Sequence, residues 1–245
     1  MSNLIKMNLY RLIRTKSYYI ILGILGMFAV MVTYSMGVYP EEYMSKEIAI
    51  IPNVIVAFFR GSLIPMVITI GVGIFVCSDY TSGYMKNIAS SVKSRGNIAI
   101  AYIITWAIGV AIYYLVITAL LCLSSKIFMS EASINNISQL LQYLALNYFL
   151  NVVMVALAVL VSVISKRSSG TIIFMVTATN FLPLIYMLLD SKLKVNLIPY
   201  SPISNLSSID FTNMNTYGTV FISGAILLVL YSAISYYVCA KKDIA

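Results

Sequence analysis

Few side chains in this sequence could do chemistry, and its residue types exclude most familiar catalytic sites. The chain contains no histidine, the side chain that most readily serves as a base near neutral pH and as a metal ligand. Its three cysteines, Cys77, Cys122 and Cys239, are widely spaced, which supports neither a zinc site nor a disulfide framework. No phosphate-binding loop of the form G-x-x-x-x-G-K-[ST] is present. We therefore expect no enzyme, and neither a metal nor a cofactor in this chain. The lack of histidine and of a buried acid pair also argues against an intramembrane protease.

The chemistry that remains lies in charged and amide groups placed within an apolar chain. The most specific segment is the polar stretch from Cys77 to Arg95, which reads CSDYTSGYMKNIASSVKSR. Its pattern predicts a short amphipathic helix lying across the membrane surface, with Tyr84 and Ile88 on one stripe and Gly83 before it, where the chain bends. Such a helix would give a soluble partner a rigid element to push. The alternative interpretation is an ordinary solvated loop.

Four polar residues inside or near apolar runs are candidates for a transport pathway. An arginine at the bilayer centre costs at least ~2.5–3.5 kcal/mol. We therefore expect Arg60 near the outer end of its span, where it faces either a wet pathway or the outer headgroups. Asn147 and Asn151 are four positions apart and share a helix face, and Asn180 lies in the next run. These amides either line a cavity or form hydrogen bonds between helices.

The elements that position these residues are membrane-spanning helices. Hydrophobic residues make up 60% of the 245-residue chain and charged residues only 10%, whereas a soluble domain carries about 25% charged residues. Helices are the consistent secondary structure, because an open sheet in lipid would leave backbone groups unpaired. We expect an all-α membrane protein, a single domain over residues 1–245, with six spans at about 18–38, 54–77, 98–123, 140–164, 171–189 and 217–239.

The segment before the first span has its own pattern. Apolar residues recur at helical spacing between positions 4 and 13, while Lys6, Arg11 and Arg14 fall elsewhere on the helical wheel. This predicts a short helix in the cytoplasmic interface, with its cations near anionic headgroups. The alternative is a simple basic anchor.

Positive charges in the short loops predict the orientation. Eleven lie in one set of segments: Lys6, Arg11, Arg14, Lys16, Lys86, Lys93, Arg95, Lys166, Arg167, Lys241 and Lys242. The opposite set holds four: Lys46, Lys126, Lys192 and Lys194. Since cytoplasmic loops carry the excess of lysine and arginine, we expect a multi-pass protein of the cell membrane with both termini in the cytoplasm.

At the polar stretch the sequence resembles the permease family of type-2 ABC exporters. That family shows an acidic residue, then Gly-Thr four positions later, then a short apolar helix that ends in Pro-x-Ser-Arg. Asp79 matches the acid, Gly83 the glycine and Ser94-Arg95 the closing pair, with the spacing kept. This sequence departs from the pattern with tyrosine at position 84 and valine at position 92. The basic N-terminus, the ending KKDI and the six spans extend the resemblance over essentially the whole chain.

The resemblance implies that the predicted surface helix is a coupling helix that docks on a separate ATP-binding subunit. The residues that it assigns to this interface are Asp79, Gly83, Tyr84, Lys86, Ile88 and Arg95. ATP and Mg would be bound by the partner subunit. The resemblance also implies short re-entrant helices on the outer side, within the segment 192–215 before the last span.

The function that the resemblance implies is that of a permease subunit in an ATP-driven exporter. Two permease copies, identical or different, would each dock one ATP-binding subunit. Small permeases of this length look most similar to exporters of peptides, including those for toxins and for immunity to lantibiotics, which suggests peptide or amphipathic cargo. No nucleic-acid partner is expected. The alternative is a passive channel, or a membrane sensor or scaffold, without an ATPase.

Overall fold

The fold is entirely helical throughout the part of the chain that the structure describes. The computed structural model describes residues 1–38, 51–92, 94–129, 137–193, 201–209 and 216–241. In chain order the helices are α1 (Ser2–Arg14), α2 (Lys16–Val38), α4 (Ile51–Phe59), α5 (Leu63–Thr81), α6 (Tyr84–Ser91), α7 (Gly96–Phe128), α8 (Ile137–Ser165), α9 (Ser168–Leu193), α10 (Pro202–Ser208) and α11 (Tyr217–Lys241).

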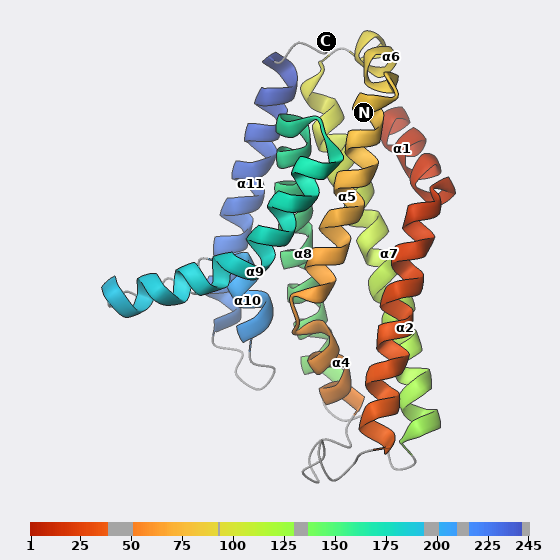
Figure 1. Ribbon diagram of the computed structural model, residues 1–245, viewed down its shortest axis with the longest axis vertical. Helices are drawn as coiled ribbons and strands as arrows, with labels where there is room; N and C mark the ends of the chain where they lie inside the picture. Colours follow the sequence, from red (N-terminus) through yellow and green to blue (C-terminus); the bar gives the residue numbers. More distant parts are fainter. Residues whose placement is uncertain (39–50, 93, 130–136, 194–200, 210–215, 242–245) are drawn as a thin grey trace.

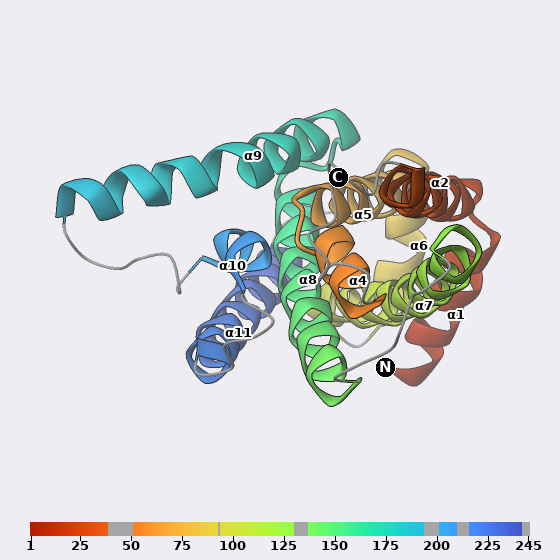
Figure 2. The ribbon, with the colours of Figure 1, turned by 90° about the horizontal axis from the view of Figure 1, so that it is seen from below.

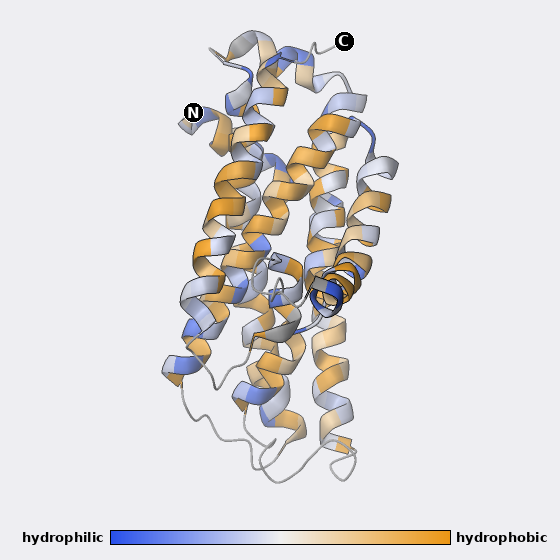
Figure 3. Cartoon of the chain, turned by 90° about the vertical axis from the view of Figure 1, so that its left-hand side faces the viewer, coloured by the Kyte–Doolittle hydropathy of each residue, from blue (hydrophilic) through white to orange (hydrophobic). Residues whose placement is uncertain are grey.

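Six of these helices, α2, α5, α7, α8, α9 and α11, are long and apolar enough to cross a membrane. Most run roughly along the long axis of the molecule (Figure 1). Apolar residues dominate the middle of the bundle and hydrophilic residues gather toward its two ends (Figure 3), which is the distribution that a bilayer demands. The expected fold class, an all-α membrane protein with six spans, is confirmed.

The helices differ in how much of their surface they bury in the bundle. α5 and α8 are mostly buried, whereas α2, α9 and α11 leave most of their apolar residues exposed. Two large, buried side chains of α7, Trp106 and Tyr102, pack against Phe75 of α5. Gly71 of α5 permits this approach, because a Cβ there would lie 3.0 Å from the Trp106 ring and closer still to Ile21. Gly71 thus leaves room for side chains of α2 and α7 to pack against α5.

The expected second span is divided. α4 ends at Phe59 and α5 begins at Leu63, so the apolar run 54–77 forms two helices rather than one. Pro65 lies in the first turn of α5, where its missing N–H is tolerated; a continuous helix would bring its ring against the carbonyl of Gly61. In the end-on view α4 lies among α5, α7 and α8 (Figure 2). It is therefore packed inside the bundle, at the end opposite α6 (Figure 1).

α9 does not follow the bundle along its whole length. Its first half runs beside the other helices, and its second half turns away from them (Figures 1 and 2). Pro183 lies within α9, and a proline inside a helix removes one backbone hydrogen bond and bends the axis. The exposed second half carries apolar side chains such as Phe181, Leu184 and Leu188.

One short helix, α10, precedes the last span. Ser201 caps it by accepting a hydrogen bond from the Ser204 N–H at 3.2 Å, and Pro202 occupies its first turn. Ile203 and Leu206 are buried in the core, so α10 is packed into the protein rather than lying on it. This agrees with a short re-entrant helix; residues 194–200 and 210–215 lie outside the described residues.

Candidate functional site

The site begins with a carboxylate buried at the end of a span. α5 continues through Thr81, so Asp79 lies in its last turn and not in a solvated loop. Its side chain is 1% exposed. Taking a carboxylate out of water costs several kcal/mol unless a counter-charge and hydrogen bonds compensate for the lost solvation. The residues around Asp79 must therefore supply both.

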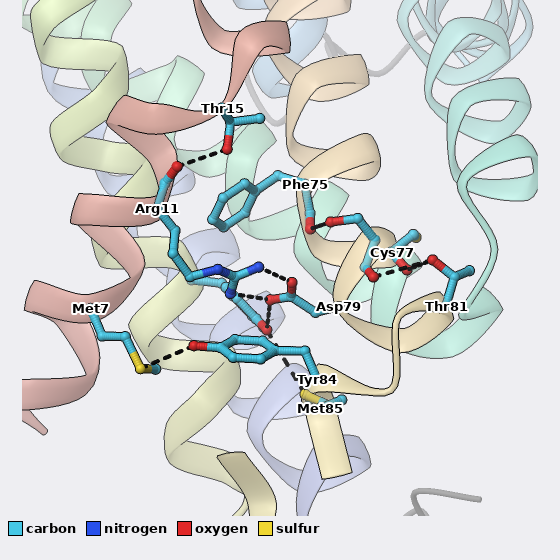
Figure 4. A network of polar contacts seen from close by, with 11 residues as sticks. Met7, Arg11, Thr15, Phe75, Cys77, Asp79, Thr81, Tyr84 and Met85 are labelled. Atoms are coloured by element: carbon cyan, nitrogen blue, oxygen red, sulfur yellow. Dashed lines mark hydrogen bonds and ion pairs between the residues drawn. The ribbon is translucent and has the colours of Figure 1, made fainter. Parts of the chain in front are cut away.

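Arg11 of α1 supplies the counter-charge. Its Nη1 donates to Asp79 Oδ2 at 2.9 Å and its Nη2 donates to Oδ1, which makes a two-pronged ion pair (Figure 4). The Tyr102 hydroxyl of α7 donates to Asp79 Oδ2 at 2.6 Å. Both carboxylate oxygens are thus satisfied, and three separate helices meet at one carboxyl group.

The Arg11 guanidinium also stacks on aromatic rings. It lies 4.0 Å from the centroid of Tyr84, the first residue of α6, and 5.3 Å from that of Phe75 on α5. The Tyr84 hydroxyl in turn donates to Met7 Sδ of α1 at 3.1 Å (Figure 4). Arginine suits this place because its flat, weakly hydrated cation can pair with a carboxylate and stack on a ring at once. α6 is thereby attached to α1 through Tyr84.

The electrostatics of Arg11 favour the charged form. Burial alone lowers the pKa of the guanidinium, but the hydrogen bond and the charge of Asp79 raise it, and the net pKa is above its ordinary value. Arg11 therefore stays protonated at every accessible pH, and the ion pair is permanent as long as Asp79 is ionised.

α6 lies against this network with one face inward. Gly83 precedes it with a φ of 71°, a left-handed conformation that glycine adopts without the steric cost of a Cβ. The turn points Met85 and Ile88 into the core, where both are almost fully buried, while Lys86 faces outward and is exposed. The helix that the sequence predicted is present, and its apolar face packs on the end of the bundle.

Some of the predicted interface residues are exposed in the structure and others are buried. Lys86 and Arg95 are exposed, and Tyr84 is half-buried on Arg11. Asp79 and Ile88 are buried, so they can act on a partner only by holding α6 in place. A docking role for Lys86 and Arg95 stays a prediction.

The N-terminal helix α1 is present as expected, with Lys6 and Arg14 exposed. Its buried face consists of Leu4, Asn8 and Leu12 and packs on α7. Arg11 was expected beside lipid headgroups, together with the other two cations. It instead turns into the protein toward Asp79.

The amides of the fourth span do not lie at this site. Asn147 is fully buried and donates to the Phe59 carbonyl at 3.2 Å, and the Tyr143 hydroxyl donates to the Val56 carbonyl at 3.4 Å. Both carbonyls lie in the last turn of α4, where intrahelical partners run out. The Val56 carbonyl also accepts the Arg60 N–H at 2.9 Å. The side chains of α8 thus cap the broken end of α4.

The same network extends to the third span. The Tyr114 hydroxyl donates to Asn147 Oδ1 at 2.5 Å and accepts from Asn151 Nδ2 at 2.7 Å. This is the arrangement expected of hydrogen bonds between helices. A pathway role for the two asparagines stays a prediction, as it does for the exposed Arg60 between α4 and α5 and for Asn180, which donates to the Val176 carbonyl at 2.8 Å.

Sequence reasoning missed the partners in the Arg11–Asp79 network. Tyr102 and Phe75 lie within apolar runs, where aromatic residues are also common as ordinary packing side chains. The spacing of Phe75 and Asp79 by four residues was the available signal, since it places the ring and the carboxylate on one face of α5. Comparisons with models of protein families and with curated proteins find no match for this chain.

Proposed function

We propose that this chain is the membrane subunit of an ATP-driven exporter, and that α6 receives the force from a separate ATP-binding subunit. One observation carries the proposal, a chain of contacts that starts at α6. The ring of Tyr84 on α6 lies on Arg11 of α1, and Arg11 is paired with Asp79 of α5. Tyr102 of α7 donates a hydrogen bond to the same carboxylate. A push on α6 therefore reaches α1, α5 and α7 through directed polar contacts.

The shape of α6 supports this role. Its underside is fixed by Met85 and Ile88, and its outer face offers Lys86 and Asn87 to solvent. A helix that is free on one side and anchored on the other can transmit a displacement as a rigid body. A loop that served only to connect α5 to α7 would need neither the anchor nor the buried ion pair, which carries a desolvation cost.

In this mechanism the ATP-binding subunits, which hold ATP and Mg, come together when ATP binds and carry α6 with them. α1, α5 and α7 then tilt as a unit against α8, α9 and α11. Two permease copies enclose the pathway between them, both termini are cytoplasmic, and cargo leaves on the opposite side. Peptide or amphipathic cargo suits the apolar exposed surfaces, and the resemblance described above favours it.

The test is co-expression with the ATP-binding protein encoded nearest to this gene, followed by purification through a tag on this chain. Lys86→Glu reverses the charge on the outer face of α6 and leaves the Arg11–Asp79 network in place. Lys16→Glu is the matched control, because Lys16 is exposed at the start of α2, away from α6. We expect the complex to form with the control and to be lost or weakened with Lys86→Glu.

The opposite result favours the alternative. If no ATP-binding protein is retained by wild-type protein in any mild detergent or nanodisc, the exporter proposal loses its basis. A passive channel or a sensor scaffold would then explain the six spans better.

A further inference from the structure

A cavity of about 340 Å³ lies where the α5–α6 turn meets the α8–α9 turn. The two turns are some 80 residues apart in the chain, and each contributes basic side chains: Lys86 from the first, Lys166 and Arg167 from the second. Thr81 and Ser165 add hydroxyl groups to the wall. Among the described residues, those that line this cavity include three cations and no carboxylate. Its chemistry is therefore that of an anion site.

The cavity is placed at the level of lipid headgroups. Thr81 is the last residue of α5 and Ser165 the last of α8, so two spans end at its wall. The 19 residues of α5 rise about 28 Å, close to the ~30 Å of the hydrocarbon core. A bound anion at this position would stand level with the phosphate layer of the bilayer.

The surroundings favour a lipid over a soluble protein as the source of the anion. Ile164 precedes the basic turn and is 51% exposed, and Ile173 and Phe174 in the first turns of α9 are 67% and 48% exposed. These side chains are of the kind that faces acyl chains. A cationic cavity at the end of spans that expose apolar side chains matches a molecule with a charged head and a hydrocarbon tail, and basic pockets between spans bind anionic headgroups.

The backbone at Lys166 is a second, independent sign. Lys166 closes α8 by donating its N–H to the Ser162 carbonyl at 2.9 Å, in a left-handed conformation with φ of 55°. This is the position at which helices prefer glycine, and a lysine there is strained. Strained residues that persist are typical of functional sites. Here the strained residue carries one of the cavity's three charges.

We propose that this cavity binds the phosphate of an anionic phospholipid headgroup, held by Lys166 and Arg167 of the α8–α9 turn. The inference is independent of any ATP-binding subunit, since it needs only the six spans and the two turns. It also gives the basic α8–α9 turn a role beyond orienting the chain.

The test uses the full-length protein in nanodiscs made from equal amounts of phosphatidylglycerol and phosphatidylcholine. After mild extraction, native mass spectrometry counts the lipids that remain bound. The double variant Lys166→Gly/Arg167→Gln removes two cations, and its glycine relieves the left-handed strain instead of adding to it. Lys16→Gln/Lys241→Gln is the control, because it removes two exposed cations from the same end of the bundle, and neither residue lines the cavity.

We expect wild type and control to retain phosphatidylglycerol in preference to phosphatidylcholine, and the cavity variant to lose this preference by roughly tenfold or more. The two single variants are measured as well, so that a folding defect in the double variant does not remove the test. Equal retention in the single or double cavity variants and in the control would overturn the proposal.

A competition arm separates lipid from free phosphate. Soluble glycerol phosphate at about 10 mM, well above the range in which one phosphate would bind, should leave the retained phosphatidylglycerol in place if acyl chains contribute to binding. Complete displacement would show a site for a free phosphate and contradict the lipid assignment. If the cavity variant keeps its lipid but loses a co-purifying protein, the cations serve that protein, and the lipid proposal is overturned.

Discussion

Arg11 and Asp79 are 68 positions apart in the chain, yet the guanidinium and the carboxylate form a two-pronged ion pair beneath the start of α6. In the sequence, Arg11 is one of several basic residues before the first span, and Asp79 is the acid of the polar stretch after the second expected span. Paired, they connect the N-terminal helix to the end of α5. This contact is the centre of the proposed force path.

Replacing Arg11 alone should destabilise the protein more than replacing Asp79 alone. Arg11→Gln leaves the Asp79 carboxylate buried without its counter-charge, whereas Asp79→Asn leaves Arg11 with 28% of its side chain exposed to solvent. We expect Arg11→Gln to cost about 2–4 kcal/mol of unfolding free energy and Asp79→Asn about 1–2 kcal/mol. Thermal unfolding of the purified protein in detergent measures both.

The double variant Arg11→Gln/Asp79→Asn provides the control for this ion pair. It removes both charges and permits amide hydrogen bonds, so it should be less destabilised than the sum of the two single variants by about 1–3 kcal/mol. Strict additivity would mean that the two side chains do not interact.

The ring of Tyr84 should contribute more than its hydroxyl to holding α6 on the bundle. The ring stacks on Arg11 at 4.0 Å, and the hydroxyl makes only a weak bond to the Met7 sulfur. Tyr84→Phe should therefore stay within about 0.5 kcal/mol of wild type, and Tyr84→Ala should cost about 1–2 kcal/mol. Limited proteolysis between α5 and α7 reports whether α6 has loosened. Equal cutting of the two variants would argue against stacking as the anchor.

Gly83 should tolerate asparagine better than alanine. Its φ of 71° is reached by glycine freely, by asparagine at a modest cost and by alanine at about 1–2 kcal/mol. Apart from its chain neighbours, none of the described residues lies within 4 Å of the position that a Cβ would take, so the backbone conformation decides the effect. Unfolding midpoints in the order Gly, Asn, Ala would support this, and an alanine variant as stable as wild type would contradict it.

Asn8 should be replaceable with a gain in stability. It is fully buried on the face of α1 that packs on α7, and among the described residues neither side-chain amide atom has a hydrogen-bond partner. A buried polar group without a partner costs about 1–3 kcal/mol, so Asn8→Leu should raise the unfolding free energy by about 1 kcal/mol or more. Asn147→Leu is the contrasting variant, because it removes the amide that donates to the Phe59 carbonyl and the oxygen that accepts from the Tyr114 hydroxyl, and it should lower stability.

Composition and periodicity predicted the large elements of this fold. Long apolar runs have one solution in lipid, so the six spans follow from the sequence, as do the amphipathic helices α1 and α6. The break between α4 and α5 was missed because Arg60-Gly61-Ser62 is only a short polar interruption in an otherwise continuous apolar run.

The site could be predicted only in part. The spacing from Asp79 to Arg95 identified the segment, and Gly83 and α6 lie where the pattern placed them. The pairing of Asp79 with Arg11 could not be predicted, because no local pattern joins residues on different helices so far apart. The position of Lys86, Lys166 and Arg167 around one cavity could not be predicted for the same reason.

The most direct measurement is ATP hydrolysis by the complex of this chain with its ATP-binding partner, reconstituted in nanodiscs, for wild type and for Arg11→Gln/Asp79→Asn. The double variant keeps the outer face of α6 intact, so the complex should assemble in normal yield. We predict that its hydrolysis no longer depends on the membrane subunit and falls to the rate of the ATP-binding subunit alone. Hydrolysis equal to wild type in an equally assembled complex would contradict the claim that force passes from α6 through Arg11 and Asp79.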